Sequence, residues 1–368
     1  MEFRAAVLHR PGEKLTIERV ALGALKPGDA LIRIRAASLC HTDLEVIEGQ
    51  LRYPLPIVLG HEAAGTVEAL GSGVEGLAPG DPVVLSWNPH CGHCFYCERD
   101  EPILCETYLR LGPKAVQFDG TARLTLAGAP LHHLMFLGSF AEYCVVPAHC
   151  AVRVPAAIPF DRACLIGCGV MTGVGAATRI ARIGYGASVL VIGCGAVGLS
   201  AVQGARLAGA GRIVALDRDA KRLDLARRLG ASDVVEAGAG DALAAVRELT
   251  GGRGADCVFE AAGSLGAFRL SAEAARPGGE IIWLGKVDVE AEVAFRWGAL
   301  MGEKRIRRSS YGGARPQRDF PLLAKAYLDG ALKLDELVSR RIPLEAINDG
   351  FAALKRGEVV RAVVTFDA

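Results

Sequence analysis

Three residues far apart in the chain have the side chains that a catalytic zinc ion uses as ligands. They are Cys40 in a Cys-His-Thr-Asp segment, His61 in Gly-His-Glu and Cys168 in Gly-Cys-Gly. Two thiolates and one imidazole hold zinc and leave a fourth position open for water or substrate. Each residue alone would more often be a packing residue, but together they predict a metal that polarises an oxygen-containing substrate.

Four further cysteines form a compact cluster. Cys91, Cys94, Cys97 and Cys105 follow the pattern C-x2-C-x2-C-x7-C in a segment rich in turn residues. Four thiolates this close can complete a tetrahedral shell around zinc, which leaves no room for substrate. A structural zinc is therefore favoured over an iron–sulfur cluster or scattered thiols. The cysteines in apolar or glycine-rich stretches are expected to be buried and inert, namely Cys144, Cys150, Cys164, Cys194 and Cys257.

A glycine-rich turn predicts a dinucleotide site. Gly193, Gly195 and Gly198 follow an apolar strand at 188–192 and open a helix at 196–207. The first glycine permits a tight turn, the second lets backbone approach a pyrophosphate, and the third lets the helix pack closely. The helix N-terminus then faces the phosphates.

Asp217 strengthens this prediction, because it ends the next strand, at 212–216, at the spacing of a ribose-binding carboxylate. Its negative charge would repel a phosphate on the ribose, so NAD is favoured over NADP. Arg218 and Arg222 leave NADP open, since either can neutralise a phosphate.

The pattern of the chain changes near residue 170. Before about 155, short alternating strands punctuated by Gly and Pro indicate an all-β, barrel-like unit. Afterwards strands alternate with helices, including one at 220–229, which predicts an open, doubly wound parallel sheet and an α/β fold class. The alternation is lost from about 310, and a final strand at 358–366 is expected to return to the first unit.

The composition argues against several function classes. Lys and Arg number 42 against 41 Asp and Glu, a net charge of +1 that gives no reason to expect a nucleic-acid partner. The basic run at 304–308 is interpreted as a solvated strand face or a local anion contact. No signal peptide is recognised at the N-terminus, and Gly and charges are expected to break every apolar stretch before the roughly 18 residues of a membrane span. The cytoplasm is therefore expected, with no membrane partner.

Taken jointly, the motifs resemble those of zinc-dependent medium-chain alcohol dehydrogenases, over essentially the whole chain. They are the Gly60–Gly65 segment GHEAAG, the four-cysteine loop, the Cys168-Gly169 turn and the glycine fingerprint. The resemblance implies a GroES-like β-barrel catalytic domain at 1–169 and 311–368 and a Rossmann NAD-binding domain at 170–310. It also implies a catalytic zinc, a structural zinc, and reversible hydride transfer from a primary alcohol to NAD.

The resemblance assigns roles to neighbours of the expected zinc ligands. Thr42 matches the hydroxyl that takes up the alcohol proton, and Asp43 matches the carboxylate that orients the zinc-binding histidine. Glu62 matches a carboxylate that can bind the ion transiently. Besides the glycines and Asp217, the expected coenzyme contacts are His41, Thr172, Val197, Arg222, Leu284 and Arg361.

The substrate is less well defined. The stretch 119–143 resembles the long loop of dimeric members and of their glutathione-dependent formaldehyde dehydrogenase branch, so a homodimer is expected. Trp87 matches a pocket wall and favours a bulky or aromatic alcohol, with ordinary core packing as the alternative. Lys286 would favour a substrate with a carboxylate or other acceptor, unless it is a surface lysine, and Arg110 can meet a carboxylate.

Three alternative functions are compatible with these motifs. The first is an NAD-dependent dehydrogenase of primary, bulky or aromatic alcohols. The second is oxidation of S-(hydroxymethyl)glutathione or another thiol adduct of formaldehyde, although 48–54 largely lacks the acidic residues expected there. The third, from another class, is a non-catalytic protein that binds zinc and a nucleotide.

One position departs from the family pattern. Many members relay the proton through a histidine five residues after the first zinc cysteine, where this chain has Glu45. We hypothesise that Glu45, or water, completes the relay, the alternative being an exposed charge. We expect Glu45→Gln to shift the pH profile of turnover, because an amide cannot take up the proton. An unchanged profile would exclude the carboxylate as the relay.

Overall fold

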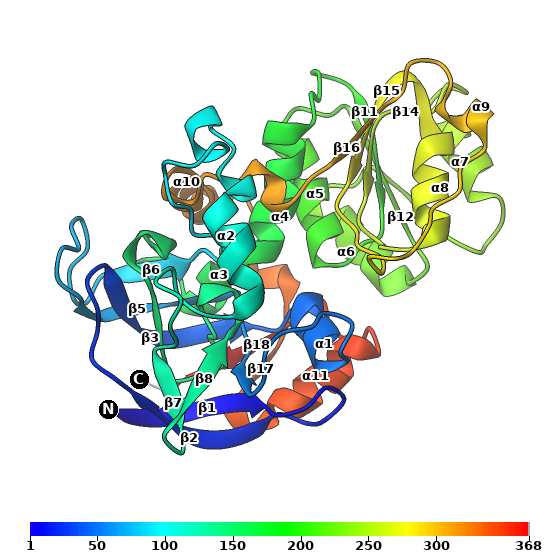
Figure 1. Cartoon of the computed structure of the whole chain (residues 1–368). Helices are drawn as coiled ribbons and strands as arrows, with labels where there is room; N and C mark the ends of the chain where they lie inside the picture. The colour runs from blue at the N-terminus through cyan, green and yellow to red at the C-terminus, as the bar shows by residue number, and fades with distance from the viewer. Residues whose placement is uncertain (367–368) are drawn as a thin grey trace. The chain divides into compact units, whose positions relative to one another are not determined.

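The computed structural model describes residues 1–366, which form two compact units (Figure 1). Unit 1 combines Met1–Cys168 with the C-terminal segment that starts at Arg315, and unit 2 is Gly169–Ala314. Each expected zinc ligand lies in unit 1, whereas the glycine-rich turn lies in unit 2.

Unit 1 is built on a small barrel and an adjoining sheet. The barrel closes in the order β1-β2-β7-β8-β4, and the sheet runs β10-β6-β5-β3-β18-β17 with β9 also paired to β3. The barrel strands are β1 (Glu2–Leu8), β2 (Thr16–Leu22), β4 (Ile57–Val58), β7 (Leu124–Leu126) and β8 (Ala129–His133). The sheet strands are β3 (Asp29–Ser38), β5 (Ala63–Leu70), β6 (Pro82–Leu85), β9 (Tyr143–Pro147), β10 (Ala151–Arg153), β17 (Val338–Ile342) and β18 (Arg361–Thr365).

The last strand returns to unit 1, as the sequence predicted. In β18, Val363 lies opposite Ser38 of β3 in an antiparallel pair. The strand begins at Arg361 rather than at 358, because residues 357–360 form the turn that leads into it. Segments from opposite ends of the sequence therefore share one sheet.

The barrel-like unit predicted before residue 155 is confirmed by the closed barrel, with two short α-helices between its strands. Helices from the C-terminal segment complete the core of unit 1. In α11, Ile347, Gly350, Phe351 and Leu354 are buried at helical spacing, and the Phe351 ring packs on Phe140 with centroids 5.8 Å apart. The helices are α1 (His41–Ile47), α2 (Glu106–Leu111), α3 (Phe160–Leu165), α10 (Pro316–Leu328) and α11 (Ile347–Lys355).

Unit 2 is a parallel sheet with the strand order β13-β12-β11-β14-β15-β16. The central strand β11 is a continuous apolar run, as expected for a strand covered on both faces. Its bounds and those of α5 and α6 agree with the sequence prediction. The strands are β11 (Ser188–Ile192), β12 (Arg212–Asp217), β13 (Asp233–Glu236), β14 (Ala255–Glu260), β15 (Ala275–Trp283) and β16 (Arg305–Arg308). The helices are α4 (Met171–Gly175), α5 (Ala196–Leu207), α6 (Ala220–Leu229), α7 (Ala242–Leu249), α8 (Leu265–Ala274) and α9 (Trp297–Leu300).

The helical run Phe160–Ile180 corrects one expectation from the sequence. Its length and mean hydropathy would allow a membrane crossing, although the sequence reading found no stretch long enough. Glycine interrupts such a run without lowering its average hydropathy much. Of its most apolar window, 72% is buried inside the protein, which is typical of a core helix.

A buried histidine adjoins an ionic network in unit 1. Arg123 is buried and donates to both carboxylate oxygens of Asp29, at 2.6 and 3.0 Å, and to Asp119 at 3.1 Å. Among the described residues, neither ring nitrogen of His133 has a hydrogen-bond partner in another side chain. Burial, and then the positive charge of Arg123, lower the pKa of His133 to about 4.

We predict that His133 makes the fold acid-sensitive. Its folded pKa lies below the ordinary value of 6.5, so the unfolded chain binds the proton more tightly. The stability of the neutral form is therefore present above pH 6.5 and is lost as the pH falls toward 4, by roughly 3 kcal/mol. His133→Leu should flatten the pH dependence of the unfolding free energy, measured with urea. The neighbouring, partly exposed His132 is the control, and an equal effect of His132→Leu would contradict the prediction.

Candidate functional site

The structure brings the expected zinc ligands of unit 1 together. Ligand atoms of Cys40, His61, Glu62 and Cys168 all lie within 4.8 Å of one another. Cys40 ends the segment after β3 and caps α1, while His61 and Glu62 stand just before β5. Cys168 lies in a one-turn π-helical segment, Ile166–Val170, a distortion that often marks functional sites.

This donor set fits zinc. Among the described residues, neither buried Glu62 carboxylate oxygen has a hydrogen-bond partner, although Oε2 lies within ion-pair distance of Arg361, and a metal cation would satisfy the remaining oxygen. Burial raises the pKa of Glu62 to about 8, against the opposing charge of Arg361. A hydrogen bond from Cys168 and the charges of Arg361 and His61 outweigh burial and lower the pKa of Cys40. The thiolate form that metal binding requires is therefore favoured at Cys40.

Asp43 connects the two loops that carry the ligands. Its carboxylate accepts the Cys40 N–H at 3.3 Å, the Gly60 N–H at 3.0 Å and the Nδ1–H of His61 at 3.1 Å. Burial alone would lower the pKa of His61, but the charges of Asp43 and Cys40 raise it well above its ordinary value. With Nδ1–H donating to a carboxylate, Nε2 is the nitrogen that faces a metal, and metal binding would displace the proton that Nε2 carries in the metal-free protein.

Arg361 lies beside this cluster rather than on the surface. It is buried, with Nη2 3.3 Å from Oε2 of Glu62 and 3.9 Å from Sγ of Cys40. The guanidinium would balance the negative charge that the cysteine and glutamate ligands carry in their deprotonated, metal-binding forms. Its expected contact with the coenzyme pyrophosphate remains a prediction.

The other predicted residues of this region lie on or near α1. His41 is exposed, whereas Thr42 and Glu45 are half-buried in the helix that also carries Asp43. Their roles in coenzyme binding and proton transfer remain predictions.

The four-cysteine loop gathers its thiols as expected. The sulfur atoms of Cys91, Cys94, Cys97 and Cys105 lie within 4.8 Å of one another, and the Cys91 N–H points at the Cys105 sulfur at 3.3 Å. The backbone N–H of His93 and a side-chain hydrogen bond from Thr107 outweigh burial and lower the pKa of Cys91 to about 6. Four thiols fit a closed tetrahedral zinc shell.

In unit 2, the glycine turn has room where a dinucleotide phosphate would sit. Gly193 has φ +91°, and a Cβ there would meet the backbone of Ala262 at 2.6 Å. A Cβ at Gly198 would lie 1.8 Å from the Gly193 carbonyl oxygen, so only glycine lets α5 pack on the turn. A Cβ at Gly195, by contrast, would stand in open space. This free side of the turn fits a pyrophosphate at the α5 N-terminus.

Asp217 supports the turn from the end of β12. Its Oδ2 accepts the Cys194 N–H at 2.6 Å, and its Oδ1 accepts the Asp219 N–H at 3.0 Å. Arg222 lies 3.7 Å from the Asp219 carboxylate, so part of its charge is already balanced. This pairing weakens the argument for a ribose phosphate and agrees with NAD.

The remaining predicted coenzyme contacts of unit 2 lie in or next to α4, α5 and β15, and their roles remain predictions. Thr172 is half-buried in α4, and Val197 is half-buried in the first turn of α5. Leu284 is buried at the end of β15, where its N–H donates to the Glu260 carbonyl at 2.8 Å.

The Asp43 carboxylate gives a test of the metal centre. Asp43→Ala removes the carboxylate that orients the His61 ring and leaves two buried N–H groups without an acceptor. We therefore expect the affinity for the catalytic zinc to fall about 10–100-fold. Zinc per chain, measured by atomic emission after dialysis against a weak chelator, should drop from two toward one. Asp43→Asn retains an acceptor oxygen and should lose less. Unchanged zinc affinity in Asp43→Ala would contradict this role.

Comparisons with known proteins agree with this geometry. Residues 26–156 match the family description Alcohol dehydrogenase GroES-like domain, and residues 196–328 match Zinc-binding dehydrogenase. A protein from Escherichia coli O139:H28, named S-(hydroxymethyl)glutathione dehydrogenase, is 34% identical over the full length of both chains. An alcohol dehydrogenase zinc-binding domain protein from Burkholderia ambifaria superposes with a TM-score of 0.96 at 35% identity, again over both whole chains. Benzyl alcohol dehydrogenase from Acinetobacter calcoaceticus superposes with a TM-score of 0.94 at 29% identity, with full coverage of both. The chain belongs to the zinc-dependent medium-chain alcohol dehydrogenase family, as an enzyme that uses zinc and NAD.

Proposed function

We propose that this enzyme oxidises primary alcohols with bulky or aromatic side groups, reversibly giving the aldehyde. The observation that carries the proposal is a group of packed aromatic side chains in unit 1 that adjoins the Cys168 side of the metal centre. The choice of a primary alcohol is taken from the family resemblance.

The aromatic group begins at Trp87. Its ring lies 6.2 Å from that of Tyr108, which in turn lies 5.6 Å from Phe136, and Phe118 meets Phe136 edge-on at 5.1 Å. Such tilted and edge-on pairs are favourable. Phe136 is fully buried in a core cluster, whereas Trp87 and Tyr108 are half-buried and form the part of the group that a ligand could reach. A ligand with an aromatic ring is well suited to such a wall.

Two observations connect this wall to the metal ligands. The pKa of Tyr108 is raised by burial and further by nearby groups that include Tyr53 and Cys168. The Leu85 carbonyl oxygen lies so close to Gly167 that a Cβ there would approach it to 2.7 Å. Leu85 precedes Trp87 by two residues and Gly167 directly precedes Cys168. The segments that carry Trp87 and Cys168 therefore run close to each other at Leu85 and Gly167.

The chemistry follows from the residues around the substrate oxygen. When bound, zinc supplies the Lewis acidity that lets an alcohol hydroxyl ionise near neutral pH, and NAD supplies the two-electron acceptor. In this proposal Thr42 receives the hydroxyl proton and Glu45 or water carries it onward. Asp43 fixes the His61 ring, and Arg361 offsets the negative charge that remains.

A thiol adduct of formaldehyde is the second candidate, supported by the name of the relative from Escherichia coli. That substrate would need acidic groups for the amine of glutathione. In 48–54 the acidic residue is Glu48, whose carboxylate lies 2.7 Å from the Lys355 ammonium and accepts from Gln50 at 3.2 Å. A carboxylate already paired in this way is less available to a ligand, so we favour the aromatic alcohol.

We further propose a homodimer that works in the cytoplasm. Large apolar side chains are exposed on unit 2, with Val289 at 86%, Trp297 at 78% and Met301 at 60%. Exposed apolar groups of this kind often mark protein contacts. The mass of the protein in solution decides between monomer and dimer.

The substrate proposal predicts a preference that depends on Trp87. NADH formation should give a higher kcat/KM for benzyl alcohol than for ethanol. Trp87→Ala should lower the benzyl alcohol value about tenfold or more, because it removes apolar contact area, and should affect ethanol less. Trp87→Phe is the matched control that keeps an aromatic wall.

The same assay separates the alternatives. Formaldehyde turnover that requires glutathione and exceeds benzyl alcohol turnover would favour the thiol adduct. Two zinc ions per chain without turnover of any alcohol would favour a non-catalytic protein. A carboxylate-bearing alcohol, tested with Lys286→Met, measures whether Lys286 selects an acceptor group.

A further inference from the structure

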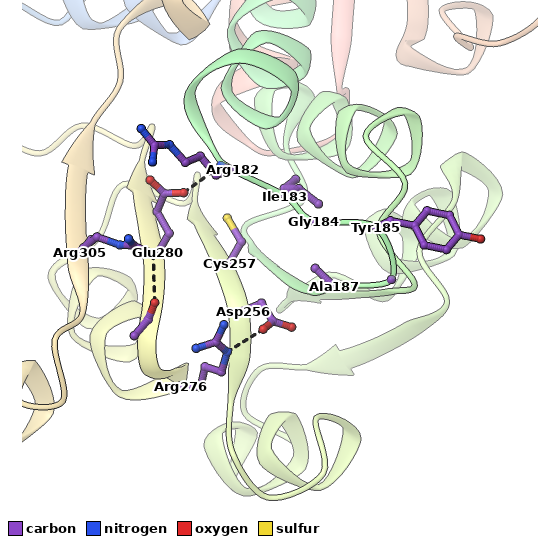
Figure 2. A pocket seen from close by; sticks show the side chains of 12 residues that line it. Arg182, Ile183, Gly184, Tyr185, Ala187, Asp256, Cys257, Arg276, Glu280 and Arg305 are labelled. Atoms are coloured by element: carbon purple, nitrogen blue, oxygen red, sulfur yellow. Dashed lines mark hydrogen bonds and ion pairs between the residues drawn. The ribbon is translucent and has the colours of Figure 1, made fainter.

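Unit 2 contains a hollow that the proposed reaction does not use (Figure 2). Its volume is about 470 Å³, within the range of small-molecule sites. Its charged lining comes from three separate parts of unit 2, namely the segment after the Phe160–Ile180 helix, the start of β14, and β15 with β16. These charged side chains are Arg182, Asp256, Arg276, Glu280 and Arg305.

The two carboxylates of the hollow are already engaged. Asp256 accepts from Arg276 Nε at 2.6 Å and from the Ser188 N–H at 2.8 Å. Glu280 accepts the Arg182 backbone N–H at 2.9 Å and lies 3.6 Å from the Arg307 guanidinium. Their negative charge is therefore largely balanced by Arg276 and Arg307.

Two guanidinium groups at the hollow are not balanced by a carboxylate. Within residues 1–366, the side chains of Arg182 and Arg305 have no carboxylate within ion-pair distance. Arg305 donates one N–H to the Gly278 carbonyl at 3.2 Å and keeps its other donors. Figure 2 shows both guanidinium groups beside the Glu280 side chain, whereas the Tyr185 ring extends away from them. The hollow therefore has an excess of positive charge and of hydrogen-bond donors.

The position of Arg305 follows from the sheet register. In the parallel pair of β15 and β16, Arg305 lies opposite Glu280 at the amino end of both strands' paired region. Arg307 reaches back to the Ile180 carbonyl and Arg308 to the Trp283 carbonyl, each at 2.9 Å. The basic run of the sequence is thus divided between structural contacts and one arginine that faces the hollow.

The hollow lies at the amino ends of the strands of unit 2, whereas the glycine-rich turn lies at their carboxyl ends. Ser188, Asp256 and Arg305 stand at the amino ends of β11, β14 and β16, whereas Gly193 follows the carboxyl end of β11. A ligand in the hollow would therefore not occupy the space of the coenzyme pyrophosphate.

We propose that this hollow binds a small dianion, an inorganic phosphate or the phosphate group of a monoester, through Arg182 and Arg305. Guanidinium groups pair with phosphate oxygens through charge-assisted hydrogen bonds of fixed geometry. The volume accommodates more than the bare ion, so a phosphorylated small molecule fits the site.

The test uses the zinc-loaded enzyme saturated with NADH, so that the coenzyme site is filled. Inorganic phosphate and phenyl phosphate are titrated by calorimetry at low ionic strength, since salt screens such contacts. We expect Arg182→Gln or Arg305→Gln to weaken binding about tenfold each. Arg269→Gln is the matched control, because Arg269 is also exposed and donates to a backbone carbonyl, at 3.1 Å.

Each outcome decides the proposal. Binding by the wild type that is weakened about tenfold or more in both variants and unchanged in Arg269→Gln supports it. Absence of binding by the wild type, or equal binding by all four proteins, overturns it. Tighter binding of phenyl phosphate than of phosphate identifies a monoester as the ligand, and equal binding identifies the free ion. Circular dichroism and melting curves confirm that the variants are folded.

Discussion

The metal centre depends on one buried carboxylate, Asp43. It accepts hydrogen bonds from Cys40, Gly60 and His61, so a single side chain sets the position of two ligand-bearing loops. A buried carboxylate is costly unless its oxygens are satisfied, and here every contact that satisfies it also positions a ligand or its neighbour. The stability of this region and the geometry of the metal ligands therefore have the same origin.

Charge balance is the second constraint on unit 1. In their deprotonated, metal-binding forms, the Cys40, Cys168 and Glu62 side chains would concentrate negative charge in a buried volume, and Arg361 brings a guanidinium to it from the last strand. The hollow of unit 2 shows the reverse situation, since Arg182 and Arg305 exceed the carboxylates beside them. In both places, the groups that remain unbalanced within the protein indicate what kind of ligand each site accepts.

The sequence predicted the local features well. Strand β11, helices α5 and α6 and the glycine turn follow from apolar periodicity and spacing, which are local properties. The contact between Glu62 and Arg361 was not predictable, because it arises only when β18 pairs with β3. The helices of unit 1 were not predicted, because most of them are short and have few apolar positions from which a helical period could be recognised. The aromatic wall from Trp87 to Phe136 and the hollow around Arg305 depend on loop paths and strand register, which leave no periodic signal.

The position of β18 has a consequence for biosynthesis. Cys40, His61, Glu62 and Cys168 all leave the ribosome well before Arg361, the residue that neutralises them, because unit 2 is encoded between them. During translation, the nascent N-terminal segment therefore carries an incomplete sheet, in which Ala36–Ser38 of β3 lack their partner strand and the metal ligands lack the Arg361 guanidinium. Closure of that edge therefore has to wait until the whole of unit 2 has been synthesised, because unit 2 lies between the two paired segments in the sequence.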